Sequence, residues 1–158
     1  MSILVFIEHK AGVLNKTSLE AIAAGQKLAG DTSQRVSAVV LGSAALAGEI
    51  AGYELEKVIS VENDKLAEYT PDAYAAGLEH IVRATNPEYV IMSHTYQARD
   101  FAPKVAARFQ KGLIGDCIRM NVEGDKRVFT RRIFLGNGDA KKGAVELAEK
   151  LRTEARVI

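Results

Sequence analysis

Residues 3–41 read ILVFIEHKAGVLNKTSLEAIAAGQKLAGDTSQRVSAVVL, two short apolar runs on either side of a helical pattern. The runs Ile3–Ile7 and Val36–Leu41 are continuous, which is typical of strands covered on both faces. Thr17 and Glu20 have the spacing of a capping box, so we expect a helix to begin there. Its inward face would carry Leu19, Ile22, Ala23 and Ala29. The unit therefore predicts two parallel strands joined by a crossover helix.

The same alternation of apolar runs and helical patterns continues beyond this stretch. Lys57–Val61 and Tyr89–Met92 read as strands, and Thr70-Pro71-Asp72 is a typical helix start. That helix would bury Tyr74, Leu78, Ile81 and Val82. Ser43 can cap a short helix, and Asp100–Gln110 reads as a longer one. Four strand–helix units predict a parallel sheet with right-handed crossovers.

The pattern changes near the C-terminus. Cys117–Val122 and Arg127–Leu135 read as strands, and Glu123-Gly124-Asp125 between them is a hairpin turn signal. Ala144–Ala155 reads as a charged helix. The predicted fold class is α/β, with one doubly wound, mostly parallel sheet, helices on both of its faces and an antiparallel hairpin near the C-terminus. We expect residues 1–158 to form a single domain.

The composition restricts the class of protein. The chain has 158 residues, 47% hydrophobic and 26% charged, which is typical of a folded domain and not of a disordered one. A net charge of +1 and the lack of tryptophan argue against a nucleic-acid binder. No apolar run is long enough to cross a bilayer, and we expect no secretion leader. With one cysteine, Cys117, no internal disulfide can form, so we expect a cytoplasmic protein.

The candidate site residues follow two of the predicted strands. Glu8 and His9 come after the first strand, and His94 and Thr95 come after the fourth. Open α/β sheets bind ligands and partners at the carboxyl ends of strands where the strand order reverses, so these side chains are expected at one edge. The alternatives are a polar pocket or contact surface, and a pair of solvated loop histidines. The candidates for cofactor contact are Glu8, His9, Thr95 and Arg99.

Other polar side chains are expected to be structural. Asp100 would cap the fourth helix and leave Arg99 on the surface. His80 would be solvated, and Cys117 would be a small buried apolar residue. A solvated strand edge, more than a phosphate site, is favoured for the cations Lys126, Arg127, Arg131 and Arg132. A flavin-stacking slot is not indicated by the scattered tyrosines Tyr53, Tyr69 and Tyr74.

Recognised catalytic and metal-binding motifs are absent from the sequence. It has no G-x-G-x-x-G after the first strand, no Walker lysine loop, no G-x-S-x-G turn and no H-E-x-x-H helix. His9, His80 and His94 lack metal-ligand spacing. We therefore expect no catalytic residue and no metal site.

Four segments, taken in order, resemble the electron-transfer flavoprotein alpha subunit. They are Ile3–His9 with the helix from Thr17, Tyr89–Arg108 (YVIMSHTYQARDFAPKVAAR), Gly112–Cys117 and Phe129–Asn137. The likeness covers residues 3 to about 137. Ala98 stands where the family usually has glycine, and Phe134-Leu135 replaces tyrosine-alanine. The family's flavin-contacting segments (a G-R-G loop, an S-R turn and a Q-T-G segment) do not occur in this sequence.

This resemblance implies a scaffold or interaction domain of a flavin electron carrier that works between dehydrogenases and an acceptor. The fold would be the adenine-nucleotide-hydrolase-like sheet, and the chain would resemble the family's N-terminal domain. The partner implied is a beta subunit in a heterodimer, with a homo-oligomer as a further arrangement. FAD would belong to the complete complex, and we expect none to be held by this chain alone. The chain would be a carrier subunit and not an enzyme.

A stand-alone adenine-nucleotide-binding module of the universal-stress type is the alternative function. That type carries a G-x-x-G-x(8–9)-G-S/T phosphate loop after its fourth strand, whereas Ser93–Asp100 contains no glycine. An enzyme with His9 or His94 as a base is a third reading, and the sequence offers it no recognisable nucleophile or orienting carboxylate. The sequence therefore favours the carrier domain.

Overall fold

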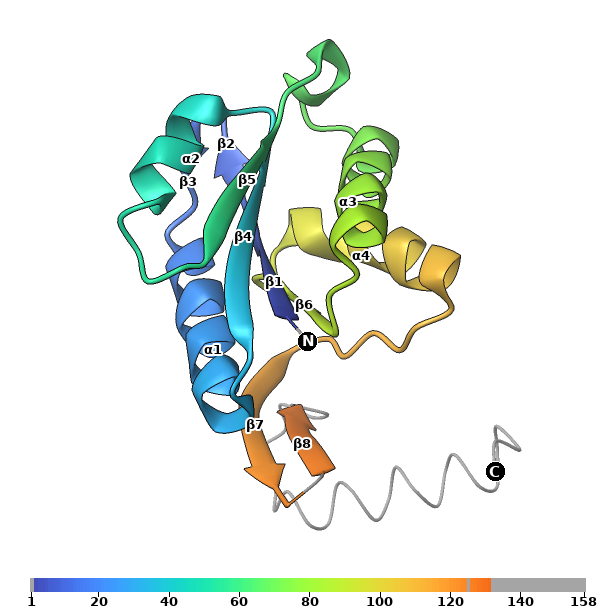
Figure 1. The fold of residues 1–158 in the computed structure, drawn as a ribbon. Coiled ribbons are helices and arrows are strands. Elements are labelled where there is room, and N and C mark those ends of the chain that lie inside the picture. Colours follow the sequence, from blue (N-terminus) through green and yellow to red (C-terminus); the bar gives the residue numbers. More distant parts are fainter. Residues whose placement is uncertain (1, 125, 132–158) are drawn as a thin grey trace, which may run out of the picture.

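A computed structural model describes residues 2–124 and 126–131 of the chain, and its centre is a parallel sheet (Figure 1). The strand order is β5-β4-β1-β6. The bounds are β1 (Ser2–Ile7), β4 (Arg35–Leu41), β5 (Lys57–Val61) and β6 (Tyr89–Ile91). All three pairings are parallel, so the predicted sheet is confirmed.

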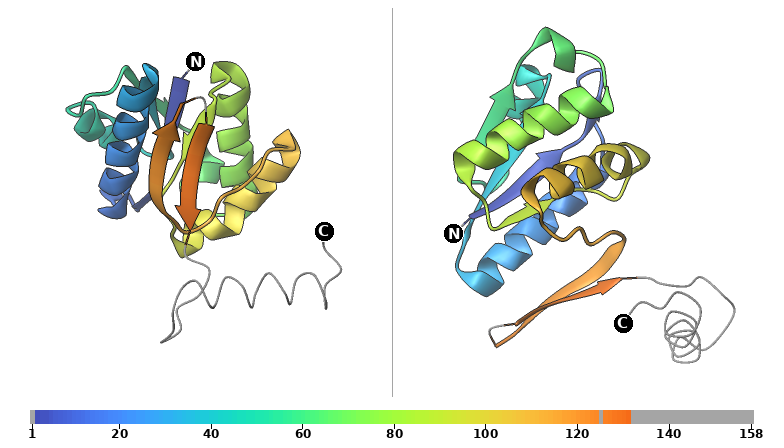
Figure 2. Two further views of the ribbon diagram at one scale, coloured as in Figure 1. Left: turned by 90° about the horizontal axis from the view of Figure 1, so that it is seen from below. Right: turned by 90° about the vertical axis from the view of Figure 1, so that its right-hand side faces the viewer.

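Helices cover both faces of this sheet (Figure 2). The first face is covered by α1 (Thr17–Thr32) and α2 (Ala44–Ile50), and the other by α3 (Pro71–Thr85) and α4 (Tyr96–Phe109). A short 3-10 helix, η1 (Asp64–Leu66), precedes α3. The predicted doubly wound α/β fold is therefore confirmed.

The core lies in two layers because successive side chains of a strand point to opposite faces. Ile3, Val5 and Ile7 of β1 pack in the cluster that includes α1 and α2. Leu4 and Phe6 pack in the cluster under α3 and α4. Each of these five side chains is at most 2% exposed, and burying one stabilises the fold by roughly 1.5–3 kcal/mol. A continuous apolar run is thus what a strand between two helix layers requires.

The predicted capping box of α1 is wrong. The residue before the helix is Lys16, which makes no side-chain capping bond. Instead, Asn15 Oδ1 accepts hydrogen bonds from the Thr17 amide (3.2 Å) and the Thr17 hydroxyl (3.0 Å). Of the predicted inward face, Ile22 and Ala29 are buried and Leu19 is half-buried, whereas Ala23 is exposed. The buried residues of α1 are Ser18, Ala21, Ile22, Gly25, Leu28 and Ala29.

The start of α4 also differs from the prediction. The helix begins at Tyr96 and not at Asp100, because the Thr95 side chain accepts a hydrogen bond from the Ala98 amide (3.0 Å). Pro103 consequently lies inside the helix. By contrast, α3 begins at Pro71 as predicted and buries Tyr74, Leu78 and Ile81, with Val82 half-buried.

Two antiparallel hairpins leave the main sheet. Between β1 and α1, the chain forms the small pair β2 (His9–Lys10) and β3 (Val13–Leu14). The predicted C-terminal hairpin is present as β7 (Cys117–Glu123) and β8 (Lys126–Arg131), with Gly124 at φ +60 in its turn. Residues 132–135 of the predicted strand and the predicted helix Ala144–Ala155 lie outside the described residues. Across the part that is described, no helix has the length and apolarity to span a membrane.

Candidate functional site

Two of the candidate residues, Glu8 and Thr95, are in direct contact at the carboxyl ends of β1 and β6. These strands are neighbours in the sheet, as expected. One carboxylate oxygen of Glu8, Oε2, accepts a hydrogen bond from the Thr95 hydroxyl. The other, Oε1, accepts one from Asn15 Nδ2 at 2.6 Å. Glu8 is buried, at 8% exposure, so this charge lies inside the fold.

Backbone contacts tie Glu8 to the start of α1. Its amide donates to Ser18 Oγ at 2.9 Å, and the Ser18 hydroxyl donates to the Glu8 carbonyl at 3.3 Å. Thr95 in turn caps α4. The Glu8 carboxylate therefore lies near the N-terminal ends of two helices, where the helix dipoles favour a negative charge. In a sheet of this class that is where a ligand's anion would bind.

His9 is a structural residue and not part of a pocket or a solvated loop. It is 8% exposed. Its Nε2 lies 2.6 Å from the Leu41 carbonyl, and its Nδ1 accepts from the Gly12 amide at 3.2 Å. Because Nδ1 accepts, Nε2 carries the proton and donates to Leu41. Both ring nitrogens are engaged, and His9 fastens the chain after β1 to the end of β4.

Two further predicted positions, His94 and Arg99, are exposed and line the groove described below. His94 is exposed, and its Nδ1 lies 3.7 Å from Asp116 Oδ1. Arg99 is exposed, with its guanidinium 5.7 Å from the ring centre of Tyr96. His80 is exposed, as predicted. Of the four candidates, the structure thus joins Glu8 with Thr95 and leaves His9 and Arg99 in other contacts.

The tyrosines are less scattered than the sequence suggests. Tyr69 and Tyr74 meet edge to face at 4.9 Å, and Tyr74 lies 6.1 Å from Phe101 in the same arrangement. The Tyr69 hydroxyl donates to Asp100 Oδ2 at 2.8 Å, so Asp100 holds this tyrosine instead of capping α4. Burial, followed by the hydrogen bond to Asp100, raises the pKa of Tyr69 well above its ordinary value. These rings form core contacts under α3 and α4.

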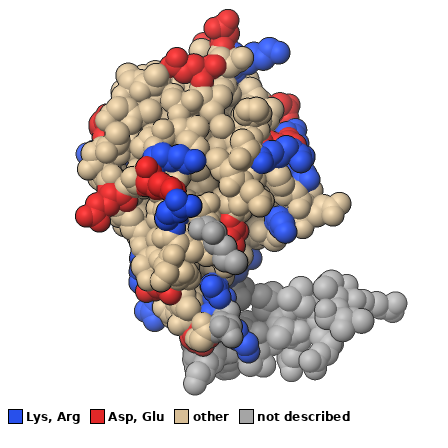
Figure 3. Space-filling view, in the orientation of Figure 1, with Lys and Arg blue, Asp and Glu red and all other residues tan. Residues whose placement is uncertain are grey.

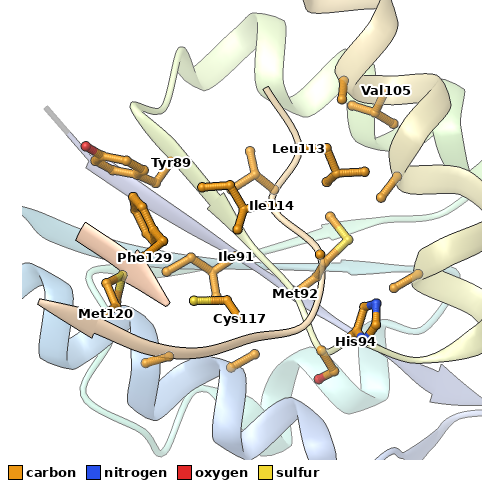
Figure 4. A pocket seen from close by; sticks show the side chains of 18 of the residues that line it. Tyr89, Ile91, Met92, His94, Val105, Leu113, Ile114, Cys117, Met120 and Phe129 are labelled. Carbon is orange, nitrogen blue, oxygen red and sulfur yellow. The ribbon is translucent and has the colours of Figure 1, made fainter. Parts of the chain in front are cut away.

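A large groove, which we name the β6 groove, runs beside β6 (Figure 4). Its walls are β6 with Met92 and Ser93, one side each of α1 and α4, the end of α3 with the residues that follow it, the segment 111–121 and Phe129 of β8. Its volume is about 1940 Å³, well above the roughly 300–1,000 Å³ of ordinary small-molecule pockets. The size suits a polypeptide better than a small ligand.

Apolar side chains are exposed on the 111–121 wall of this groove. Leu113 is 49% exposed, Ile114 47% and Ile118 54%. Cys117 is also exposed, so the prediction of a buried cysteine is wrong. The sequence alone does not predict this surface, because Leu113 and Ile114 lie between two glycines in a segment that looks like a connection between a helix and a strand. The signal in the sequence is an apolar pair outside any predicted strand or helix.

The described residues contain no cluster of three or more His, Cys, Asp or Glu side chains suited to a metal ion. On the hairpin, Lys126 and Arg131 are exposed and Arg127 is half-buried, whereas Arg132 lies outside the described residues. Acidic and basic side chains are interspersed over the face seen in Figure 3. On that face, the charge is mixed and forms no broad field of one sign.

Comparisons with known proteins agree with the fold and the resemblance. The model of the electron transfer flavoprotein domain matches residues 3–151. The electron transfer flavoprotein subunit alpha of Bacillus subtilis is 39% identical over 136 residues, which are 85% of this chain and 41% of that protein. The corresponding subunit of Syntrophomonas wolfei is 38% identical over 139 residues, 87% of this chain and 43% of that protein.

A third relative carries a different name. The acryloyl-CoA reductase electron transfer subunit beta of Anaerotignum propionicum is 36% identical over 128 residues, 80% of this chain and 35% of that protein. The chain therefore spans about two fifths of the length of the curated relatives it matches. On the extent of the family match, the chain belongs to the electron transfer flavoprotein family and is similar to its alpha subunits.

Proposed function

We propose that this chain is an interaction domain of a flavin electron carrier that works between dehydrogenases and an acceptor. In this proposal residues 1–158 form a single α/β domain that corresponds to the N-terminal domain of an alpha subunit and associates with a beta subunit. The domain positions its partner and carries out no reaction of its own. Its single cysteine, which can form no internal disulfide, suits a cytoplasmic carrier.

The observation that carries the proposal is the buried Glu8 carboxylate. A sheet of this class binds ligands at the edge where Glu8 and Thr95 meet. Here that edge is filled by the chain's own side chains, through the hydrogen bonds of Glu8 with Asn15 and Thr95. An edge closed in this way supports a scaffold, whereas a large groove, the β6 groove, remains among the described residues.

FAD belongs to the complete carrier in this proposal, because the described residues do not fit it. The flavin's pyrophosphate needs free donors at a helix N-terminus. At the start of α4 the Ala98 amide is already bonded to Thr95, and the buried Glu8 carboxylate nearby would repel a phosphate. We therefore derive no electron-transfer step through residues of this chain and assign flavin binding to the remainder of the carrier.

The universal-stress type of nucleotide-binding module is not favoured by the same geometry. AMP and ATP carry phosphates that would have to displace Glu8, whose two carboxylate oxygens are both hydrogen bonded. The family match also points away from it. A calorimetric titration with AMP distinguishes the two functions, since only the nucleotide-binding module would give saturable heat.

Sedimentation of the full chain with a co-expressed beta subunit tests the proposal. We expect a stable 1:1 complex, because the proposed role of the domain is to associate with one beta subunit. The proposal would be overturned if the chain formed no complex with the beta subunit and bound AMP tightly. The variant His80→Ala, on an exposed face of α3, is the control and should leave the complex unchanged.

A further inference from the structure

The Tyr69 hydroxyl is bonded to a carboxylate at the surface of the domain. It donates to Asp100 Oδ2 at 2.8 Å and lies 3.3 Å from the Gln97 carbonyl oxygen. The Tyr69 ring is half-buried, whereas Asp100 is exposed. Lys104, one turn along α4 from Asp100, is paired with Asp72 at 2.7 Å. The Asp100 carboxylate is thus placed to accept the phenolic proton of Tyr69.

Negative charges act on this phenol. Burial, followed by the hydrogen bond to Asp100, raises the pKa of Tyr69, and the charges of Asp100 and Glu8 act in the same direction. A negative charge that opposes ionisation of the hydroxyl also favours removal of an electron, because the positive charge left on the ring is attracted to it. Loss of an electron makes a phenol strongly acidic, so its proton leaves when a base lies at hydrogen-bond distance. The Tyr69–Asp100 pair therefore has the geometry to lose an electron and a proton together.

The two most exposed tyrosines lack such a base. Tyr53 is 41% exposed and Tyr96 is 88% exposed. Among the described residues, neither of their hydroxyls bonds a carboxylate. The Arg99 guanidinium lies 5.7 Å from the centre of the Tyr96 ring, and its positive charge opposes the loss of an electron there. Exposure and ease of oxidation thus favour different tyrosines.

The two remaining tyrosines are also less suited to oxidation. Tyr74 is 3% exposed, so a dissolved oxidant does not reach its ring. Tyr89 lies beside Glu88, but the charge of Arg127 acts against that of Glu88 on its hydroxyl. By contrast, every cause that shifts the pKa of Tyr69 acts in the same direction. Tyr69 therefore combines a ring that an oxidant can reach with a base for its proton.

We propose that Tyr69 is a site of one-electron oxidation, at which the small radical oxidant nitrogen dioxide takes an electron and Asp100 takes the proton. The oxidant is reduced to nitrite. The Tyr69 O–H bond breaks, which leaves a tyrosyl radical and a neutral Asp100 carboxylic acid. A second nitrogen dioxide radical then forms a C–N bond at the ring carbon next to the oxygen, and the hydrogen of that carbon moves to the oxygen. The product is 3-nitrotyrosine, and the exposed Asp100 releases its proton to water.

Nitration would break the contact that makes it possible. A nitro group beside the hydroxyl makes the phenol far more acidic, so the modified Tyr69 would carry a negative charge. That charge would face Asp100 at hydrogen-bond distance, and the two would repel each other. The segment after η1 would then lose its bond to α4. This inference goes beyond the proposed function and does not depend on a beta subunit.

Radiolysis of the full chain in a nitrite solution saturated with nitrous oxide tests the proposal, because it generates nitrogen dioxide throughout the solution. Tandem mass spectrometry of tryptic peptides then gives the nitrated fraction of each tyrosine. We expect Tyr69 to carry a larger nitrated fraction than Tyr53 or Tyr96. A larger fraction on either of these two exposed side chains would mean that exposure selects the target, and would overturn the proposal.

A pair of variants tests the role of the carboxylate. Asp100→Asn removes the proton acceptor at nearly constant shape, so the nitrated fraction of Tyr69 should fall several-fold while that of Tyr53 stays the same. Asp72→Asn is the matched control, because Asp72 is an exposed acid bonded to Lys104, and it should leave the nitration of Tyr69 at the wild-type value. If Asp100 only held the ring in place, Asp100→Asn would loosen Tyr69 and leave its nitration unchanged or raise it. Either of these results would overturn the proposal.

Discussion

Glu8 and Thr95 are 87 residues apart in the chain, and their side chains are hydrogen bonded to each other inside the fold. The contact joins the end of β1 to the residue that caps α4. The contact therefore links the start of α4 to β1, the strand that pairs with both β4 and β6. The same contact places a carboxylate where a sheet of this class would take a ligand's anion.

Thr95→Val should destabilise the domain by about 1–3 kcal/mol. The substitution removes the donor to a buried carboxylate and the acceptor that caps the Ala98 amide, at nearly constant volume. The free energy of unfolding in urea measures the loss. Thr95→Ser keeps the hydroxyl and should retain most of the stability, so a valine variant as stable as the serine variant would contradict this role.

The main sheet can be predicted because the sequence of each strand by itself carries the signal, a short apolar run, and no long-range contact is needed to recognise it. β1 and β4 are continuous apolar runs, and the predicted bounds of β5 are those that the structure has. The predicted cap at Ser43 is also present, and its hydroxyl accepts from the Leu46 amide at 3.4 Å. Burial between two helix layers leaves such a run few other conformations.

The site cannot be predicted to the same degree, because long-range contacts decide it. Both Thr95 and Asp100 are residue types that cap helices, and the contact of Thr95 with Glu8 and the bond of Tyr69 to Asp100 give each its role. His9 is held by the Leu41 carbonyl, 32 residues away. The β6 groove depends on the position of the β7–β8 hairpin, and the hydrophobic periodicity of the sequence does not predict that position.

Gly42→Ala should destabilise the domain by about 1–3 kcal/mol. Gly42 has φ +78, and a Cβ at this position would lie 2.3 Å from the Leu66 carbonyl oxygen, so the backbone would have to move. Gly48→Ala is the matched control, because Gly48 lies inside α2 and a Cβ added there would have no neighbouring atom within 4 Å. That change should stabilise the domain by roughly 0.5–1 kcal/mol. Thermal unfolding of both variants checks the opposite signs.

Leu78→Ala should cost about 2–5 kcal/mol, because Leu78 is fully buried in the cluster under α3 and α4. His80→Ala, two residues along the same helix, should cost less than about 0.5 kcal/mol, because His80 is exposed. Urea titrations of the two variants compare the faces of α3. Losses of similar size would mean that the buried face is assigned wrongly.

Stability should fall at alkaline pH through Tyr69. Burial and the bond to Asp100 raise its pKa in the folded state above the ordinary value of 10.0. The folded state thus holds the proton more tightly than the unfolded state does, and this stabilisation is present below pH 10.0 and lost as the pH rises through the folded-state pKa. The difference in urea midpoint between wild type and Tyr69→Phe should therefore shrink above pH 10.0, and a constant difference would contradict the assignment.

The chain purified without a beta subunit should be colourless. Flavin binding needs donors for the pyrophosphate and an apolar slot for the ring. At the edge where Glu8 and Thr95 meet, the nearby donors Asn15 Nδ2 and the Ala98 amide are taken by the chain's own oxygens, and the buried negative charge of Glu8 opposes a phosphate. The visible absorption spectrum after desalting is the measurement, with the complete carrier as the positive control.

Stoichiometric flavin that stays with the lone chain would contradict this prediction and show that the chain holds a flavin site. In that event Glu8→Gln, which removes the charge at nearly constant shape, would help to locate the site, since it should raise flavin uptake only if the site lies at the Glu8–Thr95 edge.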